Sequence, residues 1–174
     1  MIIMKFRKII LITIAIMITA AAAAVIFNRL SVLPPVDKTA VSTDGKIRIE
    51  EKGRRITVSE EGVEIWQLPK NVLAQDFLYG DIDHDGQDEL MILCWKRGRY
   101  GKRRPSWVKR DEIGWSQHIY IYEIDGNVVR PKWMASDIGM KAASWEFDDG
   151  KLIITDTEGV TTKWVWISWG LEKL

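Results

Sequence analysis

The sequence predicts an all-β domain that is exported behind one N-terminal apolar segment. Three observations support this: an uncharged stretch from Ile9 to Phe27, short segments downstream in which apolar and polar residues alternate, and glycine-containing turns between them. The 174 residues suffice for one domain of ordinary size and this segment. The chain has 25 Lys and Arg against 24 Asp and Glu, so its net charge by itself says nothing about nucleic-acid or acidic partners. No nucleic-acid partner is expected, because the domain should face outward from the cell.

Residues 1–29 are expected to form a membrane anchor or signal segment. Lys5, Arg7 and Lys8 precede an uncharged stretch that, as a helix, is long enough to cross about 30 Å of hydrocarbon. Cations at one end favour the cytoplasmic side, so the rest of the chain should lie outside the cytoplasm, attached to the membrane by this helix. The alanines at 20–24 also offer a cleavage site, so secretion after signal cleavage stays open as the alternative.

Residues 30–44 are interpreted as a linker and residues 45–174 as the extracytoplasmic domain. LPPVDK favours an extended backbone and STDG a turn. The segments KIRIE, RRITVS and VEIWQL then alternate apolar and polar residues, which predicts half-buried antiparallel strands. Asp125-Gly126 separates HIYIYEI from NVVRPKW, and DDG separates SWEF from KLIITD, so each pair is predicted to form a hairpin. TKWVWISW is the last predicted strand.

The segment ELMILCW is apolar at both even and odd positions, which predicts a central strand covered on both faces. Cys94, the only cysteine, lies in this segment and is interpreted as a core residue. Most of the nine Trp lie in predicted strands, so core or inter-sheet packing is expected of them. Those assigned to strands are Trp66, Trp95, Trp133, Trp145, Trp164, Trp166 and Trp169.

A weak internal repeat relates two parts of the domain. In each part a Trp is followed by a turn, an Ala, an aromatic residue, an acidic turn that ends in Gly, and an apolar strand. The repeat pairs Trp66 with Trp133, Phe77 with Trp145, and Gly86 with Gly150. Repeated β-units are typical of propeller blades, but a propeller usually needs four or more, and residues 45–174 supply strands for two or three. We therefore expect an antiparallel meander of propeller-blade-like units, forming either a partial propeller or a compact sandwich or barrel.

Residues 80–90, GDIDHDGQDEL, bring five carboxylates close together, and no Lys or Arg lies between Lys70 and Lys96. Two carboxylates about 5 Å apart repel by roughly 3 kcal/mol at an effective dielectric of 20, so we expect a cation among them. Aspartates at alternate positions, a Gly for the bend, a free carbonyl and a chelating Glu form an all-oxygen set that suits Ca²⁺. The candidate ligands are Asp81, Asp83, Asp85, the Gln87 carbonyl and Glu89. A solvated acidic turn is the open alternative, and His84 should point away from the ion, at the surface.

This stretch resembles the DxDxDGxx(D/E)L calcium motif of the FG-GAP and VCBS repeat families, which occur in integrin-alpha-type propellers and in bacterial surface proteins. Tyr79-Gly80 stands roughly where Phe-Gly often precedes the loop. The match covers about forty residues, Ile65 to Trp95 with the following strand, and the chain has one such loop where the families usually have several. The resemblance implies a calcium-binding blade with the ligands named above, and surface recognition only in a broad sense.

A basic insertion lies between the predicted central strand and HIYIYEI. Residues 96–110 carry eight cations with aromatic residues interleaved, a composition that suits anionic polymers, glycans or lipid headgroups. The candidate ligand-binding residues are Arg99, Tyr100, Lys102, Arg103, Arg104 and Trp107. A solvated loop, whose cations offset the acidic turn and whose Trp residues fold back onto the sheet, is the alternative.

The sequence favours a non-catalytic protein. It contains no nucleophile elbow and no HExxH motif, and nothing resembling a catalytic motif surrounds His84 or His118. The first interpretation is a membrane-anchored extracytoplasmic binding or interaction module with a structural calcium site. The alternatives are a structural subunit of a larger cell-envelope assembly, which would supply a protein partner, and a binder of anionic envelope polymer through the basic loop.

Overall fold

The computed structural model describes residues 10, 12–23, 32–98, 114–135 and 138–174. Residues 12–23 are helical and belong to a first unit, Met1–Val32. Within the described residues, no helix combines the length and the apolar character needed to cross a membrane. Leu33–Leu174 form the second unit, whose described residues contain strands and turns but no helix. The prediction of an all-β domain is therefore confirmed.

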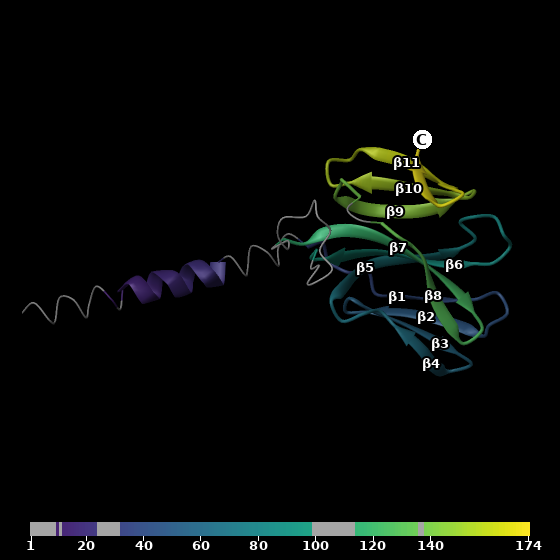
Figure 1. Ribbon diagram of the computed structural model, residues 1–174, viewed down its shortest axis with the longest axis horizontal. Coiled ribbons are helices and arrows are strands. Elements are labelled where there is room, and N and C mark those ends of the chain that lie inside the picture. The colour runs from purple at the N-terminus through teal and green to yellow at the C-terminus, as the bar shows by residue number, and fades with distance from the viewer. Residues whose placement is uncertain (1–9, 11, 24–31, 99–113, 136–137) are drawn as a thin grey trace, which may run out of the picture. The chain divides into compact units, whose positions relative to one another are not determined.

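The second unit consists of three four-stranded antiparallel sheets, and in each sheet strands that are consecutive in the chain lie side by side (Figure 1). The first sheet contains β1 (Lys38–Val41), β2 (Ile47–Lys52), β3 (Arg55–Glu60) and β4 (Val63–Gln67). The central sheet contains β5 (Val72–Gly80), β6 (Glu89–Lys96), β7 (Ser116–Asp125) and β8 (Val128–Met134). The third sheet contains β9 (Ala142–Asp148), β10 (Lys151–Asp156), β11 (Thr161–Ile167) and β12 (Gly170–Lys173).

The central sheet lies between the other two, and its side chains build two separate cores. Along β6, Leu90, Ile92 and Cys94 pack toward the first sheet, whereas Met91 and Leu93 pack toward the third. All five are 0% exposed, which is why this strand is apolar at every position from Leu90 to Trp95. Fully burying one such side chain contributes about 1.5–3 kcal/mol, so β6 anchors both cores.

One carboxylate connects the three sheets. Asp76 of β5 forms an ion pair with Lys38 of β1, and its Oδ2 accepts a hydrogen bond from Trp145 Nε1 of β9 at 2.8 Å. Lys38 also lies over the ring of Phe77, 4.9 Å from its centroid. Because each partner comes from the first strand of its sheet, this chain of contacts fixes the three layers relative to one another.

A second, fully paired polar cluster joins the central and third sheets. Gln75 Oε1 accepts hydrogen bonds from Trp95 Nε1 and Gln117 Nε2, both at 2.7 Å. The side-chain nitrogens of Gln75 and Gln117 donate to the Ala142 carbonyl, and Gln117 Oε1 accepts the Ala142 N–H at 2.6 Å. Buried amides cost little when every group is satisfied, so this cluster fixes where β9 begins.

The predicted hairpins are confirmed at β7–β8 and β9–β10, and the central strand is β6. The internal repeat corresponds to equivalent places in successive sheets, since Trp66 and Trp133 lie on the fourth strands and Phe77 and Trp145 on the first. Two expectations were wrong. Lys38–Val41, placed in the linker, form β1 because they pair with β2, and Trp169 lies in the β11–β12 turn with 73% of its surface exposed.

Candidate metal centre

The acidic stretch forms the connection between β5, which ends at Gly80, and β6, which begins at Glu89. The Asp81 carboxylate accepts hydrogen bonds from the N–H groups of Asp85 at 3.1 Å and Gly86 at 2.9 Å. Gly86 has φ 88°, a conformation that glycine adopts without strain. The loop is therefore shaped by side-chain to backbone hydrogen bonds of the kind that Asp favours in turns.

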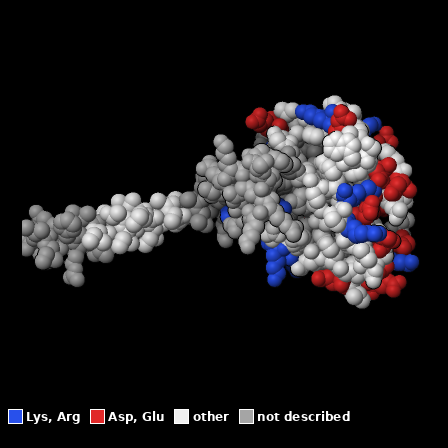
Figure 2. Space-filling model, viewed as in Figure 1, with Lys and Arg blue, Asp and Glu red and all other residues white. Residues whose placement is uncertain are grey.

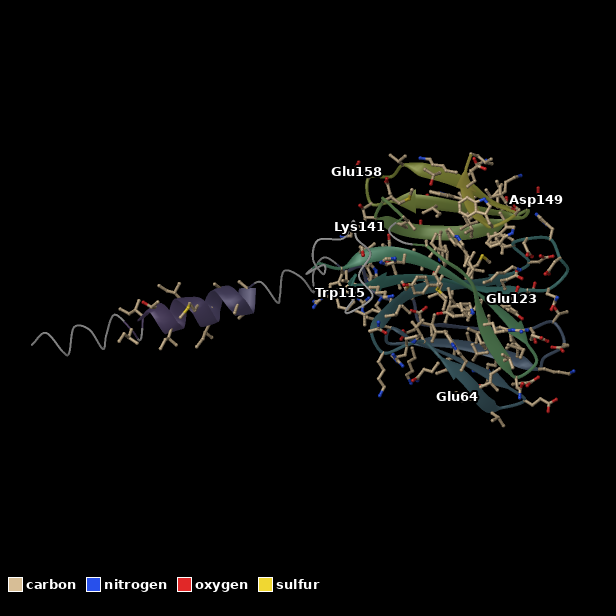
Figure 3. All side chains as sticks on the ribbon, viewed as in Figure 1. Glu64, Trp115, Glu123, Lys141, Asp149 and Glu158 are labelled. Atoms are coloured by element: carbon tan, nitrogen blue, oxygen red, sulfur yellow. The ribbon has the colours of Figure 1, made fainter. Side chains whose placement is uncertain are left out.

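The loop packs against the β9–β10 hairpin of the third sheet. A Cβ atom at Gly150 would overlap the His84 ring, and one at Gly80 would lie 3.0 Å from the Phe147 ring. His84 is exposed, as predicted, but its ring rests on the neighbouring turn and its φ is 63°. Figure 3 places Asp149, which belongs to that turn, and Glu123 of β7 at the end of the domain opposite Trp115 and Lys141.

Three of the predicted ligands converge. One carboxylate oxygen each from Asp81, Asp83 and Glu89 lie within 4.8 Å of one another. Glu89 is 1% exposed and its Oε2 accepts the Ile82 N–H at 3.1 Å. Asp83 Oδ1 is buried and has no hydrogen-bond partner among the described residues. We refer to Asp81, Asp83 and Glu89 as the acidic triad.

The acidic triad has a cationic neighbour that the sequence did not reveal. The ammonium group of Lys132, on β8, forms an ion pair with Asp83 and lies 2.8 Å from Glu89 Oε1. It is also 3.5 Å from Glu123 Oε1 and 3.8 Å from Asp85 Oδ2. Lys132 stands 43 positions after Glu89, and only the hairpin pairing of the central sheet brings the two together. No local pattern in the sequence could have identified it.

These contacts oppose the effect of burial on charge. Burial raises the pKa of Glu89, and hydrogen bonds from Lys132 and from the Ile82 N–H offset part of that rise. Burial by itself lowers the pKa of Lys132, but hydrogen bonds to Asp83 and Glu89 outweigh it, so the Lys132 pKa is raised. Lys132 therefore carries its charge at neutral pH inside the loop.

Two of the predicted ligands are not part of the triad. Asp85 Oδ1 accepts the Gln87 N–H at 2.8 Å and so stabilises the bend. Gln87 is exposed at the rim of a small cavity of about 120 Å³ beside the triad. This cavity is lined by Asp85, Gln87, Asp88, Glu89, Glu123, Ile124, Asp125 and Arg130. Figure 2 shows Asp and Glu interspersed with Lys and Arg on the surface of the domain.

The donor set fits a hard divalent cation. Oxygens bound to one Ca²⁺ at 2.3–2.6 Å are at most about 5.2 Å apart, and the triad oxygens meet that limit at 4.8 Å. All three donors are carboxylates, which suit Ca²⁺, Mg²⁺ or Mn²⁺ better than softer metals. The buried, unpartnered oxygen of Asp83 is the position where a cation would remove an unsatisfied acceptor.

The predicted ligand-binding residues of the basic loop, Arg99, Tyr100, Lys102, Arg103, Arg104 and Trp107, lie outside the described residues. On either side of that segment, cations lie over aromatic rings. Arg97 is 4.6 Å from the Trp115 centroid, and Lys141 is 5.9 Å from that of Trp95. At this end of the domain, cationic side chains therefore lie against aromatic rings.

No protein-family model, curated protein or solved structure matches this chain. The resemblance of the loop to calcium motifs therefore stays a prediction, and function must be argued from the residues themselves.

Proposed function

We propose that this chain is a non-catalytic binding or interaction module, held at the membrane by its N-terminal segment, with a structural Ca²⁺ site in the β5–β6 loop. The observation that carries the proposal is the convergence of the acidic triad, with one buried, unpartnered oxygen, on a strand-flanked loop. The likeness of residues 80–90 to the FG-GAP and VCBS motif supports the choice of calcium. An extracytoplasmic location agrees with the cations that precede residue 9.

The structural role of the ion follows from where the loop lies. The loop contacts the third sheet at Gly150 through His84, and the triad shares Lys132 with β8. A cation among the carboxylates would remove their mutual repulsion and hold the loop in the shape that contacts the third sheet at Gly150. The site then stabilises the packing of two sheets instead of performing chemistry.

The packing favours a self-contained stack of three blade-like sheets over one that needs further blades. The outer face of the first sheet carries polar side chains, among them Arg48 and Glu50, which form an ion pair at 3.7 Å. Such a face is stable in water without another sheet against it. We therefore favour a compact sandwich over a partial propeller.

A protein partner is the second candidate function, and the third sheet favours it. Its outer face has Ile153 and Val165 half-buried, and Trp169 beside it is 73% exposed. Exposed Trp is enriched at protein interfaces. Binding of anionic envelope polymer through the basic loop is a further hypothesis, supported by the cations at 96–110.

Calorimetric titration of the full chain in detergent micelles with CaCl₂ tests the proposal. We expect uptake at millimolar calcium or below, and a melting temperature that falls in chelator. At a calcium concentration of one hundred times Kd the ion adds about 2.7 kcal/mol.

The variant Asp83→Ala should lose both the uptake and the calcium dependence of melting. Asp88→Ala is the matched control, because Asp88 lies in the same loop but outside the acidic triad. Identical melting curves with calcium and with chelator would contradict the proposed site.

A further inference from the structure

Lys132 lies where a bound cation would lie. Its ammonium group contacts two of the three carboxylates of the acidic triad, Asp83 and Glu89, and its side chain is only 11% exposed. We propose that Lys132 is a built-in counter-ion of the β5–β6 loop, which a divalent cation must displace, so that Lys132 sets the affinity of the site and reports whether it is occupied. This inference rests on the proposed calcium site and concerns its regulation.

The backbone of β8 aims Lys132 at the loop. In the β7–β8 ladder, Pro131 pairs with Tyr122, and Trp133 pairs with the preceding residue, Ile121. Lys132 therefore lies at a shift of register and has no paired residue on β7 in this ladder. A β-bulge of this kind turns a side chain out of the regular alternation of the strand. The position of Lys132 is therefore set by the pairing of β8 with β7.

Lys132 and a divalent cation would compete for the same oxygens. Glu89 Oε1 is 2.8 Å from the ammonium group, and the Asp83 carboxylate is its ion-pair partner. A cation chelated by these groups would lie within a few ångströms of the ammonium group, where the repulsion between a double and a single positive charge is large in a partly buried site. Only one of them can remain in the loop.

A displaced Lys132 has other interactions available. Glu123 Oε1 is already 3.5 Å from its ammonium group, and the Glu123 side chain is 46% exposed, so a small movement would transfer the ion pair toward solvent. The ammonium group also lies 5.7 Å from the ring centroid of Trp166, on β11 of the third sheet. Displacement would therefore change the environment of a tryptophan in another sheet.

Calcium titrations of four full-length proteins in detergent micelles test this inference. Lys132→Met should bind calcium at least about tenfold more tightly than the wild-type chain, because the competing charge is gone. Lys132→Arg keeps the charge and should show no such gain.

Arg130→Met is the matched control. It removes one charge from the same strand, but Arg130 pairs with Asp125 at 2.8 Å, and among the described residues no ion pair joins it to the triad, so the affinity of this variant should stay within about twofold of wild type.

A second measurement uses the wild-type chain and does not depend on the folding of a variant. Acetylation of lysines by a water-soluble reagent, followed by peptide mass spectrometry, should show Lys132 protected in chelator and labelled several-fold faster in calcium. Lys52 is the internal control, because it is exposed at the end of β2, beside the turn whose Arg54 carbonyl accepts the Ala74 N–H near the start of β5, whereas the acidic loop follows the end of β5. Its labelling should not change.

The outcomes separate this inference from the proposed function. Calcium uptake by the wild-type chain with equal or weaker binding by Lys132→Met, or with unchanged labelling of Lys132, would overturn the displacement and leave the calcium site intact. Uptake by Lys132→Met alone would overturn the calcium site of the wild-type chain and support Lys132 as the group that excludes the ion. Absence of uptake by both proteins would overturn both.

Discussion

Among the described residues of this domain, two glutamates are almost fully buried, and their surroundings differ. Glu89, in the β5–β6 loop, is 1% exposed and has Lys132 and the Ile82 N–H as partners. Glu51, on β2, is 2% exposed, and neither of its carboxylate oxygens has a hydrogen-bond partner among the described residues. Burial does not by itself decide the charge of a carboxyl group, because a partner aimed at it decides whether ionisation is tolerated.

The cations near Glu51 are engaged elsewhere. Lys38, its neighbour on β1, forms an ion pair with Asp76, and Arg54 donates from Nη2 to the Leu33 carbonyl at 2.8 Å. Burial is the main cause that raises the pKa of Glu51 to about 8. Repulsion from Asp76 and Asp37 raises it further, and the positive charges of Lys38 and Arg54 offset only part of the rise. Glu51 is therefore protonated at neutral pH, whereas two carboxylates of the acidic triad pair with the ammonium group of Lys132.

The largest test of this comparison replaces each glutamate by glutamine. Glu89→Gln should lower the free energy of unfolding by about 3 kcal/mol at pH 6, because an amide has one oxygen and cannot accept from both the Lys132 ammonium group and the Ile82 N–H, so one buried donor loses its acceptor. Glu51→Gln should change it by less than about 1 kcal/mol, since a neutral carboxyl group is replaced by a neutral amide. Urea unfolding of the full chain measures both values. Equal losses of stability would contradict the proposed difference between a paired Glu89 and an unpaired, neutral Glu51.

The next largest effect is a dependence on pH that belongs to Glu51. Its pKa of about 8 in the folded chain lies above its ordinary value of 4.5, so its contribution to stability is fully present below pH 4.5 and is lost as the pH rises through 8. Between pH 6 and pH 9 the wild-type chain should lose about 2–3 kcal/mol of stability. Urea unfolding at both pH values measures this loss, and Glu51→Gln should remove most of it. An unchanged slope in that variant would assign the titration to other groups.

The smallest effect concerns the contact between the β5–β6 loop and the β9–β10 turn. Gly150→Ala places a methyl group in the space of the His84 ring and should cost about 1 kcal/mol more than Gly159→Ala, as measured by thermal unfolding. Gly159 is the control, because it also has positive φ, at 84°, but no atom lies within 4 Å of its added Cβ.

The double variant His84→Ala with Gly150→Ala should recover this difference, because the clashing ring is absent. A failure to recover would show that His84 is not what requires a glycine at position 150.

The sequence predicted the parts of the fold that depend on local pattern. Alternation in KIRIE and RRITVS gave half-buried strands, and the continuous apolar run at residues 90–95 gave the strand covered on both faces, because burial on each face selects apolar side chains. The internal repeat also anticipated that Phe77 and Trp145 occupy equivalent strands. What could not be predicted was the strand at 38–41, since KTAV is short and its order comes from pairing with β2.

In the candidate site, alternate aspartates and a glycine predicted a compact acidic turn from the sequence by itself, because charge spacing along eleven residues is a local property. Only the tertiary structure decided which carboxylates converge, that Asp85 serves the backbone instead, and that a lysine from β8 already lies among them. The physical reason is that counter-charges act through space. The distances between Lys132 and the carboxylates are set by a bulge in β8 and by the stacking of the three sheets. Neither can be recognised from the residues around the turn.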